Sequence, residues 1–467
     1  MRSEAAKTTA ELVARLTELG VELRPEGERL RFQAPRGVLS PETRNELVRR
    51  KKEILAWMRR RDETAPRATY EKLFEPLSIG PLELKNRLVM SPMEVDFGAA
   101  DGSVTPRAVD YYAARARGGV GLVVVEATCV DTPVGRISPH QLVIDRDDVL
   151  PGFEGLTEAV RGHGARILLQ LQHAGRKTSA AVTGRRPVAP SAVATHQGEA
   201  PRALAEGEIA ELVERYAAAA ARAQVAGFDG VEIHAAHGYL MAQFLSPTYN
   251  RREDRYGASV ENRARFLLET VAAVRRRVGH EYPIFVRLSA TEYEATDELR
   301  LVADGLTLDD TRHVARLLAE AGVSSIDVSA TLVGLPRMHP MGWPEGQLVP
   351  LAEAIREAAS IPVSVTSRLP PALGERLLRE GRLDLVTLGR ALVADPELPR
   401  KLAEGRETEV VPCIYCNECL DPALRQPAAV CAVNPGLGSE GEPRPKAAPA
   451  RRRVWVVGGG PAGMAAA

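Results

Sequence analysis

Short runs of mostly apolar residues recur along the chain between residues 87 and 392, and most are separated by segments with helical spacing. The runs are RLVMSPM, GLVVVEAT, RILLQLQH, GVEIHAA, IFVRLSA, SSIDVSA, IPVSVTS and LVTLGRAL. Strands that are apolar along their whole length are buried on both faces, as in parallel sheets covered by helices. Eight such units in about 330 residues predict an α/β fold, the closed (β/α)8 TIM barrel, spanning residues 70–405. An open, doubly wound sheet is the alternative.

The segment before the barrel, residues 1–66, has a different pattern. Leucines in 12–19 share one helical face, and Gly20 supplies a stop. The stretch VELRPEGERLRF alternates apolar and polar residues around Pro-Glu-Gly, which predicts a hairpin. A second helix opens at Ser40 before a proline and continues to Met58. We therefore expect a small separate α/β domain with the order helix, hairpin, helix.

Four of the five cysteines lie after the barrel, in PCIYCNECLDPALRQPAAVCAV. Cys413, Cys416 and Cys419 have C-x2-C-x2-C spacing, and Cys431 follows after eleven intervening residues. Clustered cysteines in a reducing compartment indicate metal ligands or redox groups before disulfides. The spacing of this segment, residues 406–440, suits one [4Fe-4S] cluster and equally a structural zinc ion.

Charge and hydropathy narrow the class of protein. The 467 residues include 61 Lys and Arg against 61 Asp and Glu, so no overall field favours nucleic acid or an anionic membrane. No apolar run approaches the roughly 20 residues of a membrane span, and acidic residues stand where a signal peptide needs an apolar core. We therefore expect a cytoplasmic enzyme with no nucleic-acid or membrane partner.

Candidate catalytic residues follow the fourth predicted strand, in EIHAAHGYLMAQFLSP. Barrel enzymes carry their chemistry at the carboxyl ends of the strands, so His234, His237 and Tyr239 would face the active-site mouth. Two imidazoles can hold a carbonyl oxygen while a tyrosine hydroxyl delivers a proton to the adjacent carbon. A packed core histidine is the plainer interpretation for either imidazole alone, and a zinc pair lacks a third ligand at a suggestive spacing.

From about Lys72 to Leu402 the chain resembles the Old Yellow Enzyme family of FMN-dependent ene-reductases, and most closely its iron-sulfur branch, which includes bacterial 2,4-dienoyl-CoA reductase. The motifs that carry this resemblance are NRLVMSPM, LLQLQHAGR, HAAHGYL, FVRLS and LGRALVADPELPRK. The resemblance implies hydride transfer from reduced FMN to the β-carbon of an enone or enoyl thioester. The histidine pair would hold the substrate carbonyl, and the tyrosine would be the proton donor.

The resemblance also implies which residues contact the flavin ring. Pro92 and Met93 would supply backbone contacts, and Gln170 would bind the edge of the isoalloxazine. Arg287 is similar to the arginine that faces flavin N1 and O2. Glu94 stands where relatives often carry a small polar residue or cysteine, so it either contacts the flavin site or faces solvent.

Other residues are implied for the FMN phosphate. Gly389 and Arg390 would bind it at the eighth strand, the usual phosphate corner of such barrels. The seventh strand, SVTSRLP, lacks the expected glycine-rich loop, so Arg368 is the candidate there. Cys129 stands apart near the second strand and is interpreted as a packing residue.

In the iron-sulfur branch, the cluster relays electrons from a carboxyl-terminal FAD domain to FMN, which makes NAD(P)H an indirect electron donor. Residues 441–467 hold a Pro-rich linker and VWVVGGGPAGMAAA, which resembles the first turn of that FAD domain. We expect the FAD site to be absent or incomplete, so that a separate reductase would supply electrons. The x2 spacing of the third cysteine is closer to the amine-dehydrogenase branch, and an amine dehydrogenase-like flavin/iron-sulfur enzyme is the alternative.

The first 66 residues resemble the TubC-type docking domain of nonribosomal peptide and polyketide synthases, most clearly at APRGVLSPE. That resemblance implies a docking role, with the hairpin receiving the tail of an assembly-line subunit; a solvated basic helix end is the alternative meaning of RRKKE. We therefore expect a tailoring ene-reductase acting on a small-molecule or carrier-bound unsaturated substrate, and a homo-oligomer is compatible with the sequence. A docking or scaffold protein whose barrel lacks turnover is a further alternative.

Overall fold

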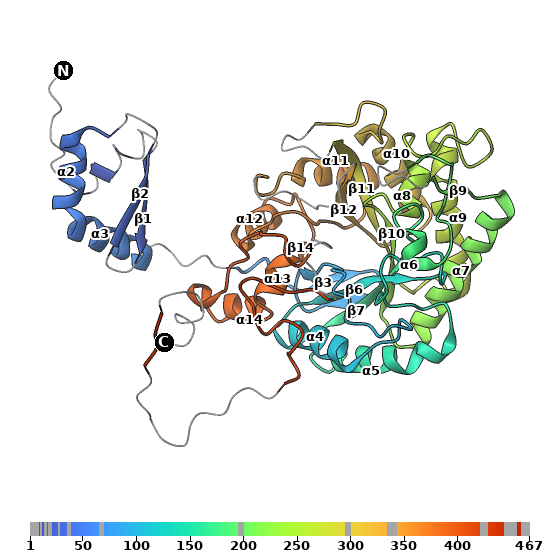
Figure 1. Cartoon of the computed structure of the whole chain (residues 1–467), viewed down its shortest axis with the longest axis horizontal. Helices are drawn as coiled ribbons and strands as arrows, with labels where there is room; N and C mark the ends of the chain where they lie inside the picture. The colour runs from blue at the N-terminus through green and yellow to red at the C-terminus, as the bar shows by residue number, and fades with distance from the viewer. Residues whose placement is uncertain are drawn as a thin grey trace. The chain divides into compact units, whose positions relative to one another are not determined.

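The computed structural model describes residues 9, 12–13, 16, 21–26, 29–34, 39–64, 70–194, 200–294, 300–333, 343–420, 428–442 and 455–458. The chain divides into two compact units, Met1–Thr69 and Tyr70–Ala467 (Figure 1). Within the described residues, no helix is long and apolar enough to cross a membrane.

The larger unit is built around eight parallel strands. They are β5 (Leu88–Met90), β6 (Leu122–Cys129), β7 (Arg166–Gln172), β10 (Gly230–Ala235), β11 (Ile284–Glu294), β12 (Ser325–Val333), β13 (Val363–Val365) and β14 (Val386–Leu388). Neighbours pair in the order β13-β12-β11-β10-β7-β6-β5-β14. A parallel bridge between Thr366 and Thr387 joins the two ends of this order. The eight strands expected from the sequence are therefore confirmed, and they form a TIM barrel.

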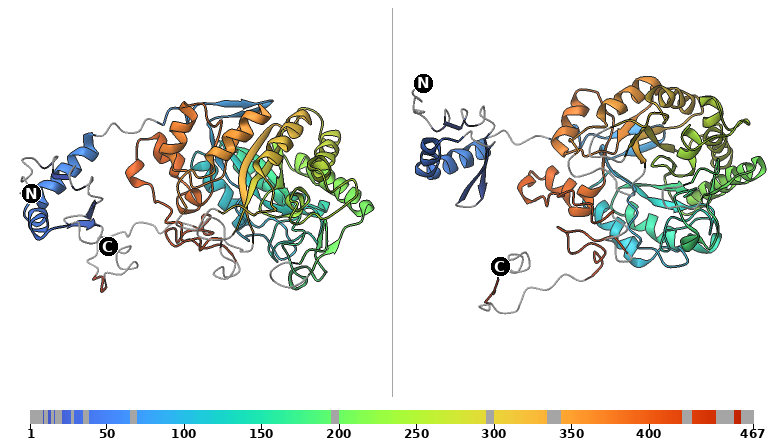
Figure 2. Two further views of the ribbon diagram at one scale, coloured as in Figure 1. Left: turned by 90° about the horizontal axis from the view of Figure 1, so that it is seen from above. Right: turned by 45° about the horizontal axis from the view of Figure 1, so that its top comes forward.

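Helices cover the outside of the strand ring (Figures 1 and 2). The longer ones are α4 (Pro106–Arg117), α5 (Leu150–Arg161), α7 (Glu206–Val225), α9 (Val260–Val278), α10 (Leu308–Glu320), α11 (Val349–Ala359) and α12 (Pro371–Arg379). Shorter elements lie in the loops: α6 (Ala180–Thr183), α8 (Leu240–Leu245), α13 (Arg390–Ala394), α14 (Leu398–Ala403), η1 (Asp147–Val149), η2 (Glu407–Glu409), β8 (Val188–Ala189) and β9 (Arg202–Ala203). Alternate strand residues such as Val231 and Ile233 point outward and pack in the large core beneath these helices.

The lower end of the barrel is closed by an apolar plug. A hairpin of β3 (Leu77–Ile79) and β4 (Leu82–Leu84) supplies part of it. The plug consists of Ile79, Leu82, Leu84, Val89, Leu122, Val124, Leu168, Phe285 and Leu385. Because apolar side chains fill this end, polar residues inside the barrel are confined to the carboxyl ends of the strands.

The smaller unit contains β1 (Glu22–Glu26) paired antiparallel with β2 (Arg29–Gln33), followed by α2 (Pro41–Arg49) and α3 (Lys51–Thr64). The hairpin is confirmed, although Pro25 and Glu26 belong to the first strand and not to the turn. The single second helix expected from the sequence is interrupted at Arg50, whose backbone N–H bonds both Glu46 and Val48. Within the expected first helix, Leu12 and Leu16 are helical and buried, while Leu19 and Gly20 lie outside the described residues.

The carboxyl-terminal part runs along the barrel unit as irregular chain. The backbone N–H of Ala429 donates to the carbonyl of Val95 (2.9 Å), and Asn434 donates to the carbonyl of Val393 (2.8 Å). Residues 455–458 carry no regular secondary structure, and the remaining glycines of the GGGPAG motif lie outside the described residues.

Candidate active site

A tight turn after β10 presents the three candidate catalytic side chains. His237 and Gly238 both have left-handed backbones, with φ of 57° and 70°, and Tyr239 then precedes α8. Gln243 holds this turn against the loop after β7, because its Nε2 donates to the carbonyls of Gly238 (2.7 Å) and Ala174 (3.2 Å). The ring of His234 lies 5.0 Å from each of the rings of His237 and Tyr239. The sequence therefore brings these three side chains together as expected.

The two imidazoles are hydrogen-bonded to each other. Nδ1 of His237 lies 3.3 Å from Nε2 of His234, and Nε2 of His237 lies 2.7 Å from the hydroxyl of Ser329. Burial, then the charges of Arg287 and Lys177, lowers the pKa of His234 well below its usual range. His234 is therefore neutral, and its buried Nδ1 has no hydrogen-bond partner among the residues that the structure describes.

A layer of polar side chains crosses the barrel beneath this pair. Arg287 lies on β11, and strand register pairs it with His234 on β10 and with Asp327 on β12. Nε of Arg287 lies 3.2 Å from Asp327 in a buried ion pair. Gln170 donates to Glu232 (2.7 Å) in the same interior. Burial and the charge of Asp327 raise the pKa of Glu232, which favours the protonated carboxyl.

The loop after β5 borders the same opening. Ser91 accepts a hydrogen bond from Arg287 (3.2 Å), which ties this loop to the polar layer. Pro92 and Met93 follow and are partly buried. A Cβ placed on Gly389 would lie 3.1 Å from the sulfur of Met93, so the glycine permits close approach of the β5 and β14 loops. Glu94 is also partly buried, and its charge acts on Lys177, so it does not simply face solvent.

The candidate phosphate residues meet the cysteine segment. The guanidinium groups of Arg368 and Arg390 lie over the ring of Tyr415, at 4.1 and 4.9 Å from its centroid. Arg390 also donates to Asn417. Burial lowers the pKa of Arg390, and the thiols of the cysteine segment oppose this effect. Two arginines from consecutive barrel loops thus gather at one corner beside the cysteines.

The four clustered cysteines lie within electrostatic range of one another. Burial raises the pKa of Cys419 to about 12, and the neighbouring thiols of Cys413, Cys431 and Cys416 add to the increase. Burial likewise raises the pKa of Cys413. Among the described residues, no group of three or more His, Cys, Asp or Glu side chains is arranged to hold a metal ion. The thiols are gathered, but no single-ion site is preassembled.

Sequence reasoning missed several residues of this site. Lys177 donates to the backbone carbonyl of His237 (3.0 Å) and is signalled only by its place after HAGR. Ser329 and Asp327 come from SSIDVSA, whose alternating polar positions point into the barrel. The buried carboxyl of Glu126 accepts from the backbone of Val95 (2.9 Å) and from Tyr112 (3.1 Å). Polar residues inside apolar strands are the signal that could have identified them.

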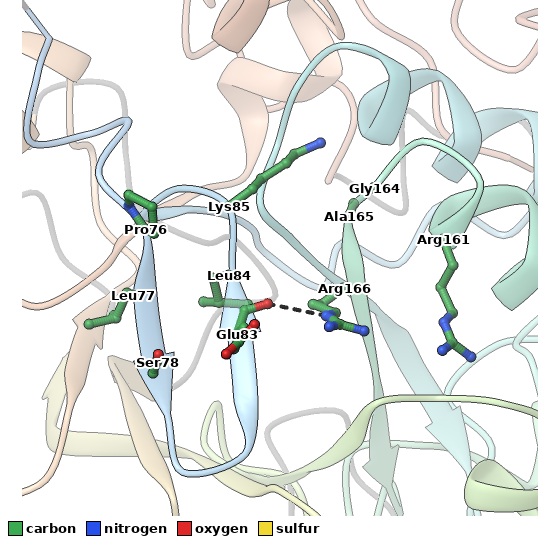
Figure 3. Close-up of a pocket in the computed structure, with 10 residues that line it drawn as sticks. All are labelled: Pro76, Leu77, Ser78, Glu83, Leu84, Lys85, Arg161, Gly164, Ala165 and Arg166. Atoms are coloured by element: carbon green, nitrogen blue, oxygen red, sulfur yellow. Dashed lines mark hydrogen bonds between the residues drawn. The ribbon is translucent and has the colours of Figure 1, made fainter.

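A shallow cavity of about 800 Å³ lies at the opposite end of the barrel, against the β3–β4 hairpin (Figure 3). Its lining includes Lys85, Arg161 and Arg166, and Arg166 donates to the carbonyl of Glu83 (3.1 Å). Asp229 lies beside both arginines and offsets their charge. This cavity is remote from the strand carboxyl ends, where the candidate catalytic residues lie, and is not assigned to the chemistry.

The fold and the polar residues at the carboxyl ends of its strands are typical of a TIM-barrel enzyme. Residues 72–409 match the NADH:flavin oxidoreductase / NADH oxidase family, so the chain belongs to this family, that of the Old Yellow Enzyme-type flavin oxidoreductases. Residues 10–60 match the TubC N-terminal docking domain.

Relatives and solved structures agree with this placement. The chain is 44% identical to NADH oxidase of Thermoanaerobacter brockii, over 85% of this chain and 61% of that protein. It is 35% identical to cinnamate reductase of Clostridium sporogenes, over 85% and 63%. A structure of 2-naphthoyl-CoA reductase matches with a TM-score of 0.79 at 30% identity, over 85% and 62%. The chain therefore spans about three-fifths of the length of these proteins.

A second similar structure is that of an enzyme named for a different reaction, a dehydrogenase. Histamine dehydrogenase from Rhizobium sp. 4-9 matches with a TM-score of 0.70 at 31% identity, over 80% of this chain and 53% of that one. NADPH dehydrogenase of Bacillus subtilis, 41% identical, aligns over 73% of this chain and 96% of its own length. The barrel is thus shared by relatives of different overall length.

Proposed function

We propose that the barrel is an FMN-dependent ene-reductase that reduces an α,β-unsaturated carbonyl compound or enoyl thioester. The observation that carries this proposal is the turn after β10, where Tyr239 lies beside a neutral His234 whose buried Nδ1 has no partner within the described part of the chain. A hydrogen-bond donor next to a phenol is the arrangement that carbonyl activation with protonation of the neighbouring carbon requires. The names cinnamate reductase and 2-naphthoyl-CoA reductase among the similar proteins support this substrate class.

The residues at the barrel mouth fit FMN. Gln170 and Arg287 would hold the ring, because Glu232 and the Asp327 ion pair already fix their orientation. Pro92, Met93 and Gly389 would border it, and Arg368 and Arg390 are the cations for its phosphate. When bound and reduced, FMN supplies the hydride. Arg287 would stabilise the negative charge on the reduced ring.

The hydrogen bonds of the histidine pair define its role. If the Ser329 hydroxyl donates to Nε2 of His237, then Nδ1 of His237 carries the proton donated to Nε2 of His234. Nδ1 of His234 is then protonated and donates to the substrate oxygen. His237 thus fixes the tautomer of His234, and Tyr239 delivers the proton to the α-carbon.

We further propose that Cys413, Cys416, Cys419 and Cys431 bind a [4Fe-4S] cluster. Four gathered thiols provide the donor set, and a cluster attaches each thiolate to a different iron atom. A structural zinc ion would use the same four thiolates, and metal analysis distinguishes the two. The cluster would receive electrons from NAD(P)H indirectly, through a reductase domain or protein.

For the N-terminal unit we propose docking to an assembly-line subunit. The match to the TubC docking domain and the compactness of Met1–Thr69 as a separate unit support this role. A tailoring reaction on a small-molecule or carrier-bound unsaturated substrate, in the cytoplasm, would follow from such docking.

An amine dehydrogenase-like enzyme is the second candidate. The similarity to histamine dehydrogenase and the x2 spacing before Cys419 favour it. The histidine pair favours the ene-reductase, because His234, oriented by His237, would donate to a carbonyl oxygen that an amine substrate does not offer.

The test uses the FMN-loaded protein, reduced with dithionite without oxygen. We expect addition of 2-cyclohexenone to reoxidise the flavin and to yield one cyclohexanone per FMN, measured by gas chromatography. The same protein in its oxidised form should not be reduced by histamine or other primary amines. Reduction by an amine, together with no turnover of enones, would overturn the proposal in favour of the second candidate.

A further inference from the structure

Lys177 packs against the turn after β10, which carries the candidate catalytic residues. It follows β7, and its Nζ donates to the backbone carbonyl of His237 at 3.0 Å. The same Nζ lies 4.9 Å from the centroid of the Tyr239 ring. A Cβ placed on Gly238 would meet Cδ of Lys177 at 3.6 Å, so the aliphatic stem packs on that glycine. One lysine thus contacts all three residues of the turn.

The charges around Lys177 come from several elements. Glu94, in the loop after β5, attracts its ammonium group, and the charge of Lys177 in turn helps to keep His234 neutral. The residue is exposed as a whole, but its ammonium group lies against the His237 carbonyl and the Tyr239 ring, and burial at this point lowers the pKa of Lys177 to about 8 despite the effect of Glu94. His237 and Tyr239 face it from the β10 turn. Lys177 is therefore mostly charged at neutral pH and loses its charge above pH 8.

We propose that Lys177 is a positioning residue that orients Tyr239 and stabilises the phenolate formed when this tyrosine gives up its proton. The inference rests on the proposed function. In that reaction the β-carbon gains a hydride with its electron pair from reduced FMN, and the α-carbon gains the hydroxyl proton of Tyr239. The tyrosine is left as a phenolate, which a cation near its ring stabilises, and it recovers a proton from solvent.

A purely structural clamp on the turn is the rival explanation, and two substitutions separate it from the proposed role. Lys177→Met keeps the length and the apolar stem but removes the charge. Lys177→Arg keeps a charge that persists well above pH 8. Lys85→Met is the matched control, because Lys85 also donates to a backbone carbonyl, that of His163 (3.0 Å), at the opposite end of the barrel.

The kinetic test follows reoxidation of dithionite-reduced FMN by saturating 2-cyclohexenone between pH 6 and pH 10. We expect Lys177→Met to slow this step by about tenfold at pH 7. The wild-type rate should fall as pH rises through about 8, and this fall should be absent in Lys177→Met and moved to higher pH in Lys177→Arg. A wild-type rate and pH profile in Lys177→Met would overturn the inference.

The binding test needs no turnover. 4-Nitrophenol resembles an enolate, and its absorption spectrum reports whether it is bound as phenol or phenolate. With oxidised, FMN-loaded protein, we expect Lys177→Met to bind it about tenfold more weakly and with less phenolate than wild type, Lys177→Arg and Lys85→Met do. Equal affinity and an equal spectrum in Lys177→Met would contradict the inference.

The outcomes distinguish the inference from the function on which it rests. Lys177-dependent phenolate binding without reduction of any enone would reject the ene-reductase and retain the positioning role. Enone reduction with the same pH profile in Lys177→Met as in wild type would retain the ene-reductase and reject the positioning role. If Lys177→Met fails to bind FMN, the reoxidation rate of Lys177→Arg above pH 8 decides the question. A rate equal to that at pH 7 supports the positioning role. A decline like that of the wild type overturns it.

Discussion

Nδ1 of His237 lies 3.3 Å from Nε2 of His234, so the two candidate carbonyl ligands are hydrogen-bonded to each other. In the His234 ring, Nδ1 is buried and has no hydrogen-bond partner among the described residues. We therefore expect His234 alone to contact the substrate. His237, held by Ser329, sets the tautomer of His234.

Ser329→Ala tests this serial arrangement. Loss of the hydroxyl at 2.7 Å from Nε2 of His237 removes the group that fixes the tautomer, without touching Tyr239. We expect the affinity of the FMN-loaded protein for 4-nitrophenol to fall about two- to tenfold, the worth of one hydrogen bond. Ser325→Ala is the control, because this serine on the same strand donates to the carbonyl of Pro362 (2.9 Å) away from the mouth. Equal losses in both variants would refute the tautomer role.

The cysteine segment gives a prediction about metal content. We expect anaerobically purified protein to contain about four irons per chain, and Cys416→Ala or Cys431→Ala to lose most of them. Cys129→Ala should retain the iron, because Cys129 is buried near the second strand and burial raises its thiol pKa. Iron and acid-labile sulfide analysis measures this outcome. Stoichiometric zinc without iron would eliminate the cluster.

Glu126 predicts a pH dependence of stability. Burial, and then the charges of Glu94 and Asp96, raises its pKa to about 8, well above that of a carboxyl in the unfolded chain. Between these values the folded protein holds a proton that the unfolded chain has released, so this group's contribution to stability falls as pH rises, by at most about 1.4 kcal/mol per pH unit. Glu126→Gln should therefore gain stability relative to wild type between pH 5 and pH 8.

Urea unfolding of both proteins at pH 5 and pH 8 measures that difference. The hydrogen bond from the backbone of Val95 can be accepted by the glutamine oxygen, so the comparison retains this contact. A free-energy difference between variant and wild type that is the same at both pH values would show that Glu126 is already ionised in the folded protein.

Removal of residues 1–69 tests the independence of the N-terminal unit. Because Met1–Thr69 and Tyr70–Ala467 are separate compact units, the truncated protein should keep its FMN content, its thermal unfolding midpoint and its reduction of a free enone. Flavin absorbance and calorimetry check this result. Loss of FMN on truncation would make the segment part of the enzyme itself and weaken the docking proposal.

The fold could be predicted from the sequence because eight mostly apolar runs alternate with helical segments, a pattern typical of a parallel sheet covered by helices. The histidines and Tyr239 could also be predicted as neighbours, since His234 lies near the end of β10 and the other two residues follow that strand directly. Lys177 was not, because its role depends on the approach of the β7 and β10 loops, which Gln243 holds together. The interruption at Arg50 likewise escaped the pattern, because apolar spacing continues across it.

The charge state of the polar layer was also beyond the sequence. Arg287 was expected to face the flavin, but its partner Asp327 comes from strand register, which places the two side by side. The charge of Asp327 also reaches Glu232, two strands away, and raises its pKa. Pairing of this kind depends on which strands are neighbours, and no local motif records it.

The central claim is that the mouth formed by His234, His237 and Tyr239 reduces an activated double bond. The most direct test measures, by anaerobic stopped flow, the rate at which saturating 2-cyclohexenone reoxidises the dithionite-reduced FMN of wild type and of Tyr239→Phe at equal FMN content. The substitution removes only the proton-donating hydroxyl, so the account predicts a rate lower by about 10²-fold or more with unchanged FMN binding. Equal rates in the two proteins would contradict it.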